Sequence, residues 1–357
     1  MTLRTVIIGT GSYIPEMKIT NSDFLDNTFF EKSGEKVSRD TDYVIEKFRE
    51  ITGIEERRYA SDDQSASDLG YLAAVEAISD ANIDKETLDY IIVAHNFGDV
   101  NHNSNRSSLV PSLASRIKSL LQIANPDCVA YDLPFGCPGW VEALIQANYF
   151  LKSGDVKRCL VIGTETLSRV IDPHDRDSMI FSDGSGAVVL EAQETTQRGI
   201  IAHKTQTHAY RFTELLNMDH SYSEDSKNEN DIYIKMNGRR VYEFALNQVP
   251  IAIKTALDKA EMSINQVKKI LIHQANEKMD NAILERLFKI YGVKEIPENI
   301  MPMTIGWLGN SSVATIPTML DLILKGKLPN HEIHSGDNVV IASVGAGMNI
   351  NALIYQF

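Results

Sequence analysis

Apolar side chains follow two rhythms along the chain, and together these rhythms predict helices alternating with strands. Residues 66–82 and 241–260 carry apolar side chains three and four positions apart, the spacing of a helix with one buried face. Short unbroken apolar runs also occur, as expected for strands buried on both faces. These runs lie at residues 91–93, 159–163, 270–272 and 338–342. The alternation predicts an α/β fold with a mainly parallel sheet.

The order of these elements repeats once along the chain. Three pairs of positions share one offset of 179 residues: 77 and 256, 91 and 270, and 159 and 338. A looser match relates residues 187–190 to 352–355. Chance likeness between generic helix–strand units could give one such pair, but three pairs at one offset favour a duplication.

The duplication predicts two similar α/β halves packed together, residues 1–195 and 196–357. Near the start of the second half lies a polar, acidic stretch, residues 210–237, of which 223–230 are wholly hydrophilic. We expect this stretch to be a surface excursion or flap.

Composition narrows the class of protein. The chain has 357 residues, 43% of them hydrophobic, and a formal net charge of −13, which argues against a nucleic-acid partner. An acidic carrier protein could bind only at a local basic patch. Three cysteines make no disulfide framework, and neither a signal peptide nor a membrane-length apolar run is present. These features predict a cytoplasmic protein that binds no membrane.

Cys137 lies where an apolar stretch ends and an amphipathic one, residues 141–151, begins. Such a strand–turn–helix junction puts the thiol at the positive end of a helix dipole, so we expect its pKa to fall and the thiolate to act as nucleophile. Cys128 and Cys159 lie inside apolar strands, and we expect them to be buried core thiols.

Two polar patterns follow other predicted strands and turns. His273 opens His273-Gln274-Ala275-Asn276 directly after the strand at 270–272, and Asn310 follows a glycine turn in Gly309-Asn310-Ser311-Ser312. Alone, such a histidine is more often structural, and such a Gly-Asn-Ser-Ser run is usually a helix cap. Ligands of parallel sheets gather beyond the carboxyl ends of the strands, so these residues could converge with Cys137.

Taken together, the motifs resemble the β-ketoacyl-acyl-carrier-protein synthase III family, within the thiolase-like condensing enzymes. The resemblance covers essentially the whole chain, at residues 8–15, 52–57, 137–151, 172–176, 181–187, 235–238, 273–276, 309–312 and 345–347. It implies a layered αβαβα thiolase-like fold, a homodimer, and acyl-CoA and malonyl-acyl-carrier protein as partners, with no cofactor.

The resemblance also implies roles for the three central residues. Cys137 would take an acyl group from acyl-CoA, and His273 and Asn310 match the family's other two catalytic residues. Decarboxylation of a malonyl thioester leaves an enolate, whose oxygen needs hydrogen-bond donors rather than a base. The backbone N–H groups of Cys137 and Gly347 would form the second oxyanion hole.

Further positions match the family's substrate-binding residues. Arg176 matches a CoA-contacting arginine, although a surface ion pair is an equal alternative, and Gly238, Tyr242 and Asn276 match the pantetheine tunnel. The family's adenine-binding tryptophan and arginine are replaced here by Tyr43 and Ile51.

Two departures concern the acyl group. Val110 stands where acetyl-specific members carry a phenylalanine, so we expect a longer or bulkier primer to fit. Trp140, close after Cys137, would enlarge the apolar wall of the acyl site.

Basic residues near the implied tunnel mouth are candidates for docking an acidic carrier, although solvated helix faces are an equal alternative. They are Lys235, Arg239, Arg240, Lys278 and Arg286. The remaining histidines show no ligand spacing, so we predict no metal site.

The residues also weigh against neighbouring chemistries. Thiolases require a second cysteine near the C-terminal glycines, and no cysteine follows Cys159 here. Hydroxymethylglutaryl-CoA synthases carry a glutamate just after the strand equivalent to 91–93, but here the first carboxylate after that strand is Asp99. The C-terminal glycines do not fit chalcone-synthase-like enzymes. We therefore predict a β-ketoacyl-acyl-carrier-protein synthase III-type acyltransferase of fatty-acid chain initiation. The alternatives are a related enzyme of secondary metabolism using the same acyl-cysteine, or a non-catalytic partner subunit.

Overall fold

Two β-sheets form the frame of the protein in the computed structural model, which describes residues 2–226 and 231–357. The larger sheet has the order β1 (Thr2–Tyr13), β9 (Asp183–Thr195), β8 (Arg158–Thr166), β4 (Tyr90–His95) and β7 (Val129–Pro134). The smaller has the order β10 (Gly199–Thr207), β15 (Asn349–Gln356), β14 (Asn338–Gly345) and β13 (Val267–Ile272). The strands therefore divide between the two sheets at residues 195–199.

Equivalent strands pair in the same way in both sheets. β4 runs parallel to β8 with Ile91 opposite Leu160, and β13 runs parallel to β14 with Ile270 opposite Val340. The expectation of mainly parallel sheets is wrong, however, because β9 lies antiparallel to β8 and to β1, and β15 antiparallel to β14 and to β10. Short 3₁₀ segments, not a crossover helix, connect β8 to β9 and β14 to β15. At both places the chain therefore turns back and the second strand runs antiparallel to the first.

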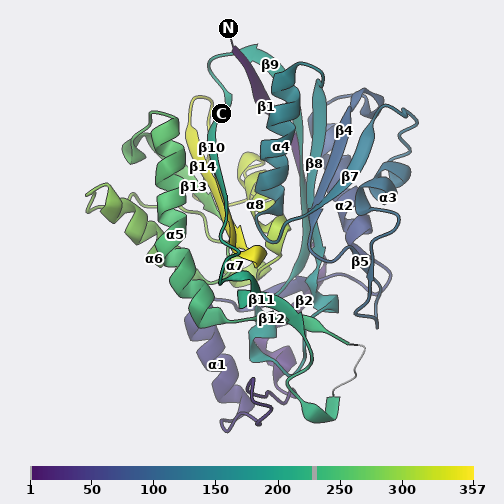
Figure 1. Ribbon diagram of the computed structural model, residues 1–357, viewed down its shortest axis with the longest axis vertical. Helices are drawn as coiled ribbons and strands as arrows, with labels where there is room; N and C mark the ends of the chain where they lie inside the picture. The colour runs from purple at the N-terminus through teal and green to yellow at the C-terminus, as the bar shows by residue number, and fades with distance from the viewer. Residues whose placement is uncertain (1, 227–230) are drawn as a thin grey trace.

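Helices fill the space between the sheets and cover their outer faces (Figure 1). α4 (Gly139–Ser153) and α8 (Thr315–Leu324) pack between the two sheets, where their apolar side chains share one core with β8, β14 and β15. α2 (Ala66–Asp80) and α3 (Leu113–Leu120) cover the larger sheet, and α5 (Gly238–Lys259) and α6 (Glu277–Ile290) the smaller. The result is the expected αβαβα arrangement.

The glycines near the N-terminus allow β1 to touch α2. A Cβ atom at Gly9 would lie 2.4 Å from the backbone nitrogen of Ala81, and one at Gly11 would lie 2.3 Å from the carbonyl oxygen of Ala73. Only glycine permits so close an approach of strand and helix backbones.

The polar stretch at 210–237 forms a small flap at one end of the molecule. It contains β11 (Leu216–Asp219) paired antiparallel with β12 (Tyr233–Met236), while residues 227–230 lie outside the described part of the chain. The remaining elements are α1 (Thr41–Thr52), α7 (Ile305–Leu308) and two short antiparallel strand pairs, β2 (Met17–Thr20) with β3 (Glu56–Tyr59) and β5 (Asp99–Val100) with β6 (Ser107–Ser108).

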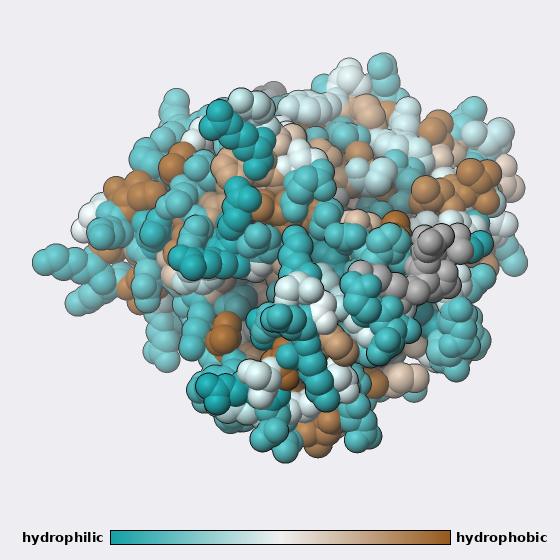
Figure 2. Space-filling model, turned by 60° about the horizontal axis from the view of Figure 1, so that its bottom comes forward, coloured by the Kyte–Doolittle hydropathy of each residue, from teal (hydrophilic) through white to brown (hydrophobic). Residues whose placement is uncertain are grey.

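Figure 2 views the molecule with this end turned forward, and hydrophilic side chains cover most of the visible face. Among the described residues, no helix combines the length and apolar character needed to cross a bilayer.

Candidate active site

One apolar cavity of about 240 Å³ contains all three residues expected to carry the chemistry. Cys137 follows β7, His273 follows β13, and Asn310 follows α7, so the two halves of the chain meet there. The other walls are mostly apolar side chains from several elements, the flap included. They include Phe97, Leu167, Phe181, Leu216, Met218, Ile234, Met236, Val241 and Met279.

The backbone around Cys137 depends on two glycines. Gly136 has a φ of +72°, and a Cβ atom there would lie 2.9 Å from the backbone nitrogen of Ala346. On the facing segment, a Cβ atom at Gly345 would lie 2.7 Å from the backbone nitrogen of Cys137. The end of β7 and the end of β14 therefore pack backbone to backbone, which holds Cys137 at the junction of the two sheets.

The environment of the Cys137 thiol corrects the expectation of a lowered pKa. Burial in the apolar cavity raises the pKa of Cys137 to about 11, and the carboxyl of Glu165 adds to the rise, while the Ser312 hydroxyl opposes it. α4 begins at Gly139, two residues beyond the thiol, and the lost hydration of the thiolate outweighs the helix terminus. At neutral pH the resting side chain is therefore a thiol.

His273 is held neutral. It is 1% exposed, and burial lowers the pKa of its imidazole to about 4, an effect that the nearby Ser312 backbone opposes only in part. The Gln274 side chain fixes the turn that follows, since its amide donates to the Pro302 carbonyl at 2.6 Å and its oxygen accepts from Thr304 N at 2.8 Å. A neutral imidazole can donate one N–H to a substrate oxygen.

The Asn310 amide has a fixed orientation. Its Oδ1 accepts a hydrogen bond from the backbone N–H of Ser312 at 2.8 Å, so its Nδ2 is the end left to donate. The Asn310 backbone is bound to the N-terminal half, because Asn310 N donates to the Ile180 carbonyl and Ser182 N donates to the Asn310 carbonyl, both at 2.9 Å. The side chain thus reaches the cavity from a loop with little freedom to shift.

A buried carboxyl behind the cavity was not predicted from the sequence. Glu165, at the end of β8, is 2% exposed and accepts hydrogen bonds from both the backbone N–H of Asn96, at 2.9 Å, and its side-chain amide. Burial raises the pKa of Glu165 to about 8, although its bonds with Asn96 lower it. The sequence feature that could have pointed to this buried carboxyl is an acidic residue at the end of an otherwise apolar strand.

This carboxyl predicts a pH-dependent stability. The pKa of Glu165 rises from 4.5 to about 8 on folding, so the native state holds a proton that the unfolded chain has lost, and stability falls as pH rises through that range. Glu165→Gln should lack this loss. We expect the stability difference between variant and wild type to grow between pH 4.5 and pH 8, at a slope of up to about 1.4 kcal/mol per pH unit. Urea unfolding at several pH values would measure it, and a pH-independent difference would contradict the assignment.

Gly347, expected to supply the second oxyanion donor, lies two residues after Gly345, which packs against the Cys137 backbone. Gly345 and Ala346 line the cavity, whereas Gly347 is not among its wall residues. A Cβ atom at Gly347 would face the side chain of Asn349 at 2.9 Å instead. The positive φ of Gly347, +73°, turns the chain into β15.

A second, polar cavity of about 450 Å³ adjoins the first, and the two share Asn217 and Met236 as wall residues. Arg176, Gly238 and Arg240 line this outer cavity. Arg176 is paired with Glu31 at 3.0 Å, so the alternative of a surface ion pair is realised at the same place as the expected CoA contact. Tyr242 and Asn276 line neither cavity, although their neighbours Val241 and Ala275 line the inner one, and Asn276 caps α6.

Comparison with known proteins agrees with this geometry. Residues 131–209 match the family described as 3-oxoacyl-[acyl-carrier-protein] synthase III, and residues 257–357 match its C-terminal part. A β-ketoacyl-[acyl-carrier-protein] synthase III of Pectobacterium atrosepticum is 33% identical over 99% of this chain and 99% of its own. One of Prochlorococcus marinus is 33% identical over 98% of this chain and 96% of its own.

The chain belongs to the β-ketoacyl-acyl-carrier-protein synthase III family. The crystal structure of 3-oxoacyl-[acyl-carrier-protein] synthase III from Aquifex aeolicus is 30% identical and superimposes with a TM-score of 0.78, covering 99% of this chain and 100% of that one. The Thermus thermophilus protein, 27% identical, gives a TM-score of 0.79 over 99% of both chains. The thiolase-like fold predicted from the sequence is confirmed.

The expectation that Trp140 lines the acyl site is wrong, because Trp140 is not among the residues of the cavity wall. It is 1% exposed and packs in the core between the sheets, where its Cβ lies 3.3 Å from the Cβ position of Gly163. As the second residue of α4, it points toward β8 rather than toward the cavity. Its large side chain therefore fills the core beside a glycine and does not shape the substrate site.

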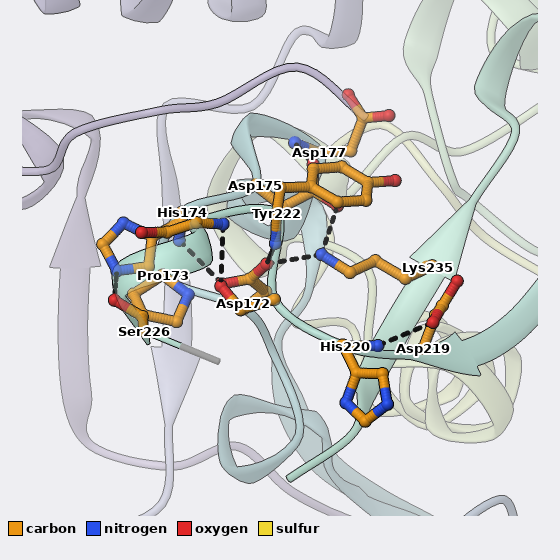
Figure 3. A network of polar contacts seen from close by, with 12 residues as sticks. Asp172, Pro173, His174, Asp175, Asp177, Asp219, His220, Tyr222, Ser226 and Lys235 are labelled. Carbon is orange, nitrogen blue, oxygen red and sulfur yellow. Dashed lines mark hydrogen bonds and ion pairs between the residues drawn. The ribbon is translucent and has the colours of Figure 1, made fainter. Parts of the chain in front are cut away.

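Lys235 is not available for docking a carrier. It is 4% exposed and forms ion pairs with Asp172 and with Asp175, the latter at 3.2 Å. Figure 3 shows its ammonium group directed at these carboxylates, with the Tyr222 ring close by, 3.5 Å from the nitrogen. The ion pairs tie β12 of the flap to the loop that carries Arg176, which the sequence alone could not show.

The other basic candidates remain on the surface. The Arg239 side chain is 89% exposed and pairs with Glu243, while Arg286 donates to the Asn247 side chain at 2.5 Å. Arg240 and Lys278 are also exposed. Val110 is 89% exposed, so in a single chain it touches no acyl site.

Cys128 and Cys159 are buried, as expected, and all three cysteines are free. Within residues 2–226 and 231–357, no cluster of His, Cys, Asp and Glu is arranged to hold a metal ion.

Proposed function

We propose that the protein transfers an acyl group from acyl-CoA to Cys137 and condenses it with malonyl-acyl-carrier protein. The products are a β-ketoacyl-carrier protein, CO₂ and CoA, the chain-initiating step of fatty-acid synthesis. The observation that carries the proposal is the cavity in which a thiol, a neutral imidazole and an oriented amide meet. The activity for which the family and its members are named supports the same reaction.

The first half-reaction is a thioester exchange. The Cys137 sulfur attacks the carbonyl carbon of the acyl-CoA, the bond to the CoA sulfur breaks, and one proton passes from Cys137 to the departing CoA. The oxyanion of the intermediate needs backbone donors close to the thiol. The Cys137 N–H and the Gly347 N–H are the proposed donors, in a segment whose Gly345 and Ala346 line the cavity.

The second half-reaction forms the carbon–carbon bond. Loss of CO₂ from the malonyl group leaves an enolate, and the N–H of neutral His273 and the Asn310 Nδ2–H donate to its oxygen. The enolate carbon attacks the acyl-Cys137 carbonyl, the bond to sulfur breaks, and the released thiolate takes up a proton. A charged imidazolium is not needed, which fits the lowered pKa of His273.

The outer cavity is the proposed entrance for both thioesters. Arg176 and Arg240 offer positive charge there, and the shared wall at Asn217 and Met236 would admit the pantetheine arm. We further propose that the enzyme is a cytoplasmic homodimer in which the exposed Val110 reaches the partner's acyl site.

A coupled assay tests the function. Malonyl-carrier labelled at the free carboxyl should yield a β-ketoacyl-carrier product only when acyl-CoA is also supplied, and labelled CO₂ should then be released faster than by the slow decarboxylation that needs no acyl-CoA. Product formed on an acceptor other than malonyl-carrier would instead favour the related enzyme of secondary metabolism, and no turnover at all would favour the non-catalytic subunit.

The acyl site predicts a preference for primers longer than acetyl. The cavity wall is almost entirely apolar, and Val110 is too small to plug a neighbouring site. We expect kcat/KM for acyl-CoAs to rise from acetyl to longer or branched chains, by about fourfold for each buried methylene. Replacement of Val110 by Phe should shift the optimum back toward acetyl. A sharp preference of the wild type for acetyl-CoA would contradict this.

The carrier-docking residues predict a salt-sensitive interaction. Reversal of charge at Arg240 and Lys278 should raise the KM for malonyl-carrier by about tenfold at low salt and by less at high salt, because exposed charges are screened. Lys157→Glu is the matched control, since Lys157 is exposed and precedes β8, at the end of the sheet remote from the cavity. An unchanged KM in the double variant would reject this docking face.

A further inference from the structure

Three side chains that the reaction itself does not use form a chain of hydrogen bonds that leads into the cavity of the catalytic thiol. Asn96 donates from Nδ2 to Ser312 Oγ at 2.8 Å, and from both its backbone and its side-chain nitrogen to Glu165 Oε1. Ser312 in turn faces the Cys137 thiol, and Asn96, Ser312 and Cys137 all line the same cavity.

The chain has a defined direction. Because Glu165 Oε1 accepts two N–H groups of Asn96, the amide must present its nitrogen, not its oxygen, to both Glu165 and Ser312. Ser312 Oγ therefore accepts a hydrogen bond from Asn96, and its own hydroxyl hydrogen is free to point at the Cys137 sulfur.

The backbone supports this arrangement. Ser312 has a φ of +53°, a left-handed conformation that is costly for a residue with a side chain and that persists where the surroundings enforce it. Its N–H is held by Asn310 Oδ1 at 2.8 Å. The turn after β4, which carries Asn96, is held by His95. The Nδ1 of His95 accepts a hydrogen bond from Gly98 N at 2.9 Å, and its Nε2 lies 3.0 Å from Asp132 Oδ2.

We propose that Glu165, Asn96 and Ser312 act as positioning residues, a relay that holds the Ser312 hydroxyl as a hydrogen-bond donor to the Cys137 sulfur and stabilises its thiolate. The relay deepens the proposed function, on which its relevance to catalysis rests. The groups that face the thiol are the Ser312 hydroxyl, His273 and the Glu165 carboxyl behind Asn96. Glu165 acts as a protonated carboxyl, since an ionised one would oppose the thiolate that the relay stabilises.

Alkylation of Cys137 by iodoacetamide tests the relay without any acyl-CoA or carrier, so its outcome is separate from that of the condensation assay. At a fixed pH near 7, where Glu165 keeps its proton, Ser312→Ala should slow alkylation by about three- to tenfold, because a donor to the thiolate is lost. Ser311→Ala is the matched control: its hydroxyl pairs with Thr315 Oγ1 at 3.3 Å, away from the thiol, and its rate should equal that of wild type.

Two further variants test the direction and the protonation state of the relay. Asn96→Ala should slow alkylation as Ser312→Ala does, and the double variant should be no slower than Ser312→Ala alone, because both act along one path. Glu165→Gln keeps a neutral acceptor and should react like wild type. A wild-type rate in Ser312→Ala, additive losses in the double variant, or a rate in Glu165→Gln as slow as in Asn96→Ala would each overturn the proposal.

Discussion

Replacement of Cys137 by Ala is expected to abolish acyl transfer and lower condensation by on the order of 10⁴- to 10⁶-fold, the scale seen when a catalytic nucleophile is removed. The sulfur is the only group in the cavity that can form the acyl thioester. His273 and Asn310 remain in place, so slow decarboxylation of malonyl-carrier without condensation should persist. Steady-state condensation and CO₂ release, measured side by side, would show this separation.

Cys128→Ala provides the matched control, because Cys128 is a free thiol buried at 1% exposure outside the cavity. It should keep full condensation activity after allowance for any loss of stability. If Cys137→Ala retained acyl transfer, or if Cys128→Ala lost it, the assignment of the nucleophile would be wrong.

Asn310→Asp is expected to reduce condensation by about 10²- to 10³-fold, the usual effect of losing one oxyanion donor. The substitution is nearly isosteric and keeps an oxygen to accept the Ser312 N–H, but it removes the Nδ2 donor and places negative charge near the enolate. Single-turnover kinetics would measure acyl loading and condensation as separate steps.

Loading of Cys137 from acyl-CoA serves as the internal control for this variant, because the Asn310 amide acts only in the second step. Loading should stay within a few-fold of the wild-type rate. Equal losses in both steps would show instead that Asn310 maintains the shape of the whole cavity.

Much of the fold could be predicted from the sequence because the same order of helix and strand occurs twice along the chain. The repeat at one offset matched β4 with β13 and β8 with β14, and in the structure β4 runs parallel to β8 as β13 does to β14. The antiparallel direction of β9 and β15 could not be predicted in this way. It depends on how the segment before each strand folds, and the length of that segment does not determine this. Cys137 and His273 each follow a strand and Asn310 follows a glycine turn, and the resemblance of these motifs to one family assigned their roles together.

The properties that sequence reasoning missed depend on contacts between distant segments. Lys235 reads as a surface lysine until Asp172 and Asp175, some sixty residues earlier, enclose it. The thiol pKa was predicted in the wrong direction because helix position is local, whereas burial by the flap and by β14 is not. For the same reason, the carboxyl of Glu165 gained significance only from the fold.

The most direct test of the account is the mass of the protein after incubation with an acyl-CoA. We predict an increase of one acyl group, located on Cys137 by peptide mapping, which disappears when malonyl-carrier is added and CO₂ is released. An acyl group on any other residue, or one on Cys137 that malonyl-carrier fails to discharge, would contradict the central claim.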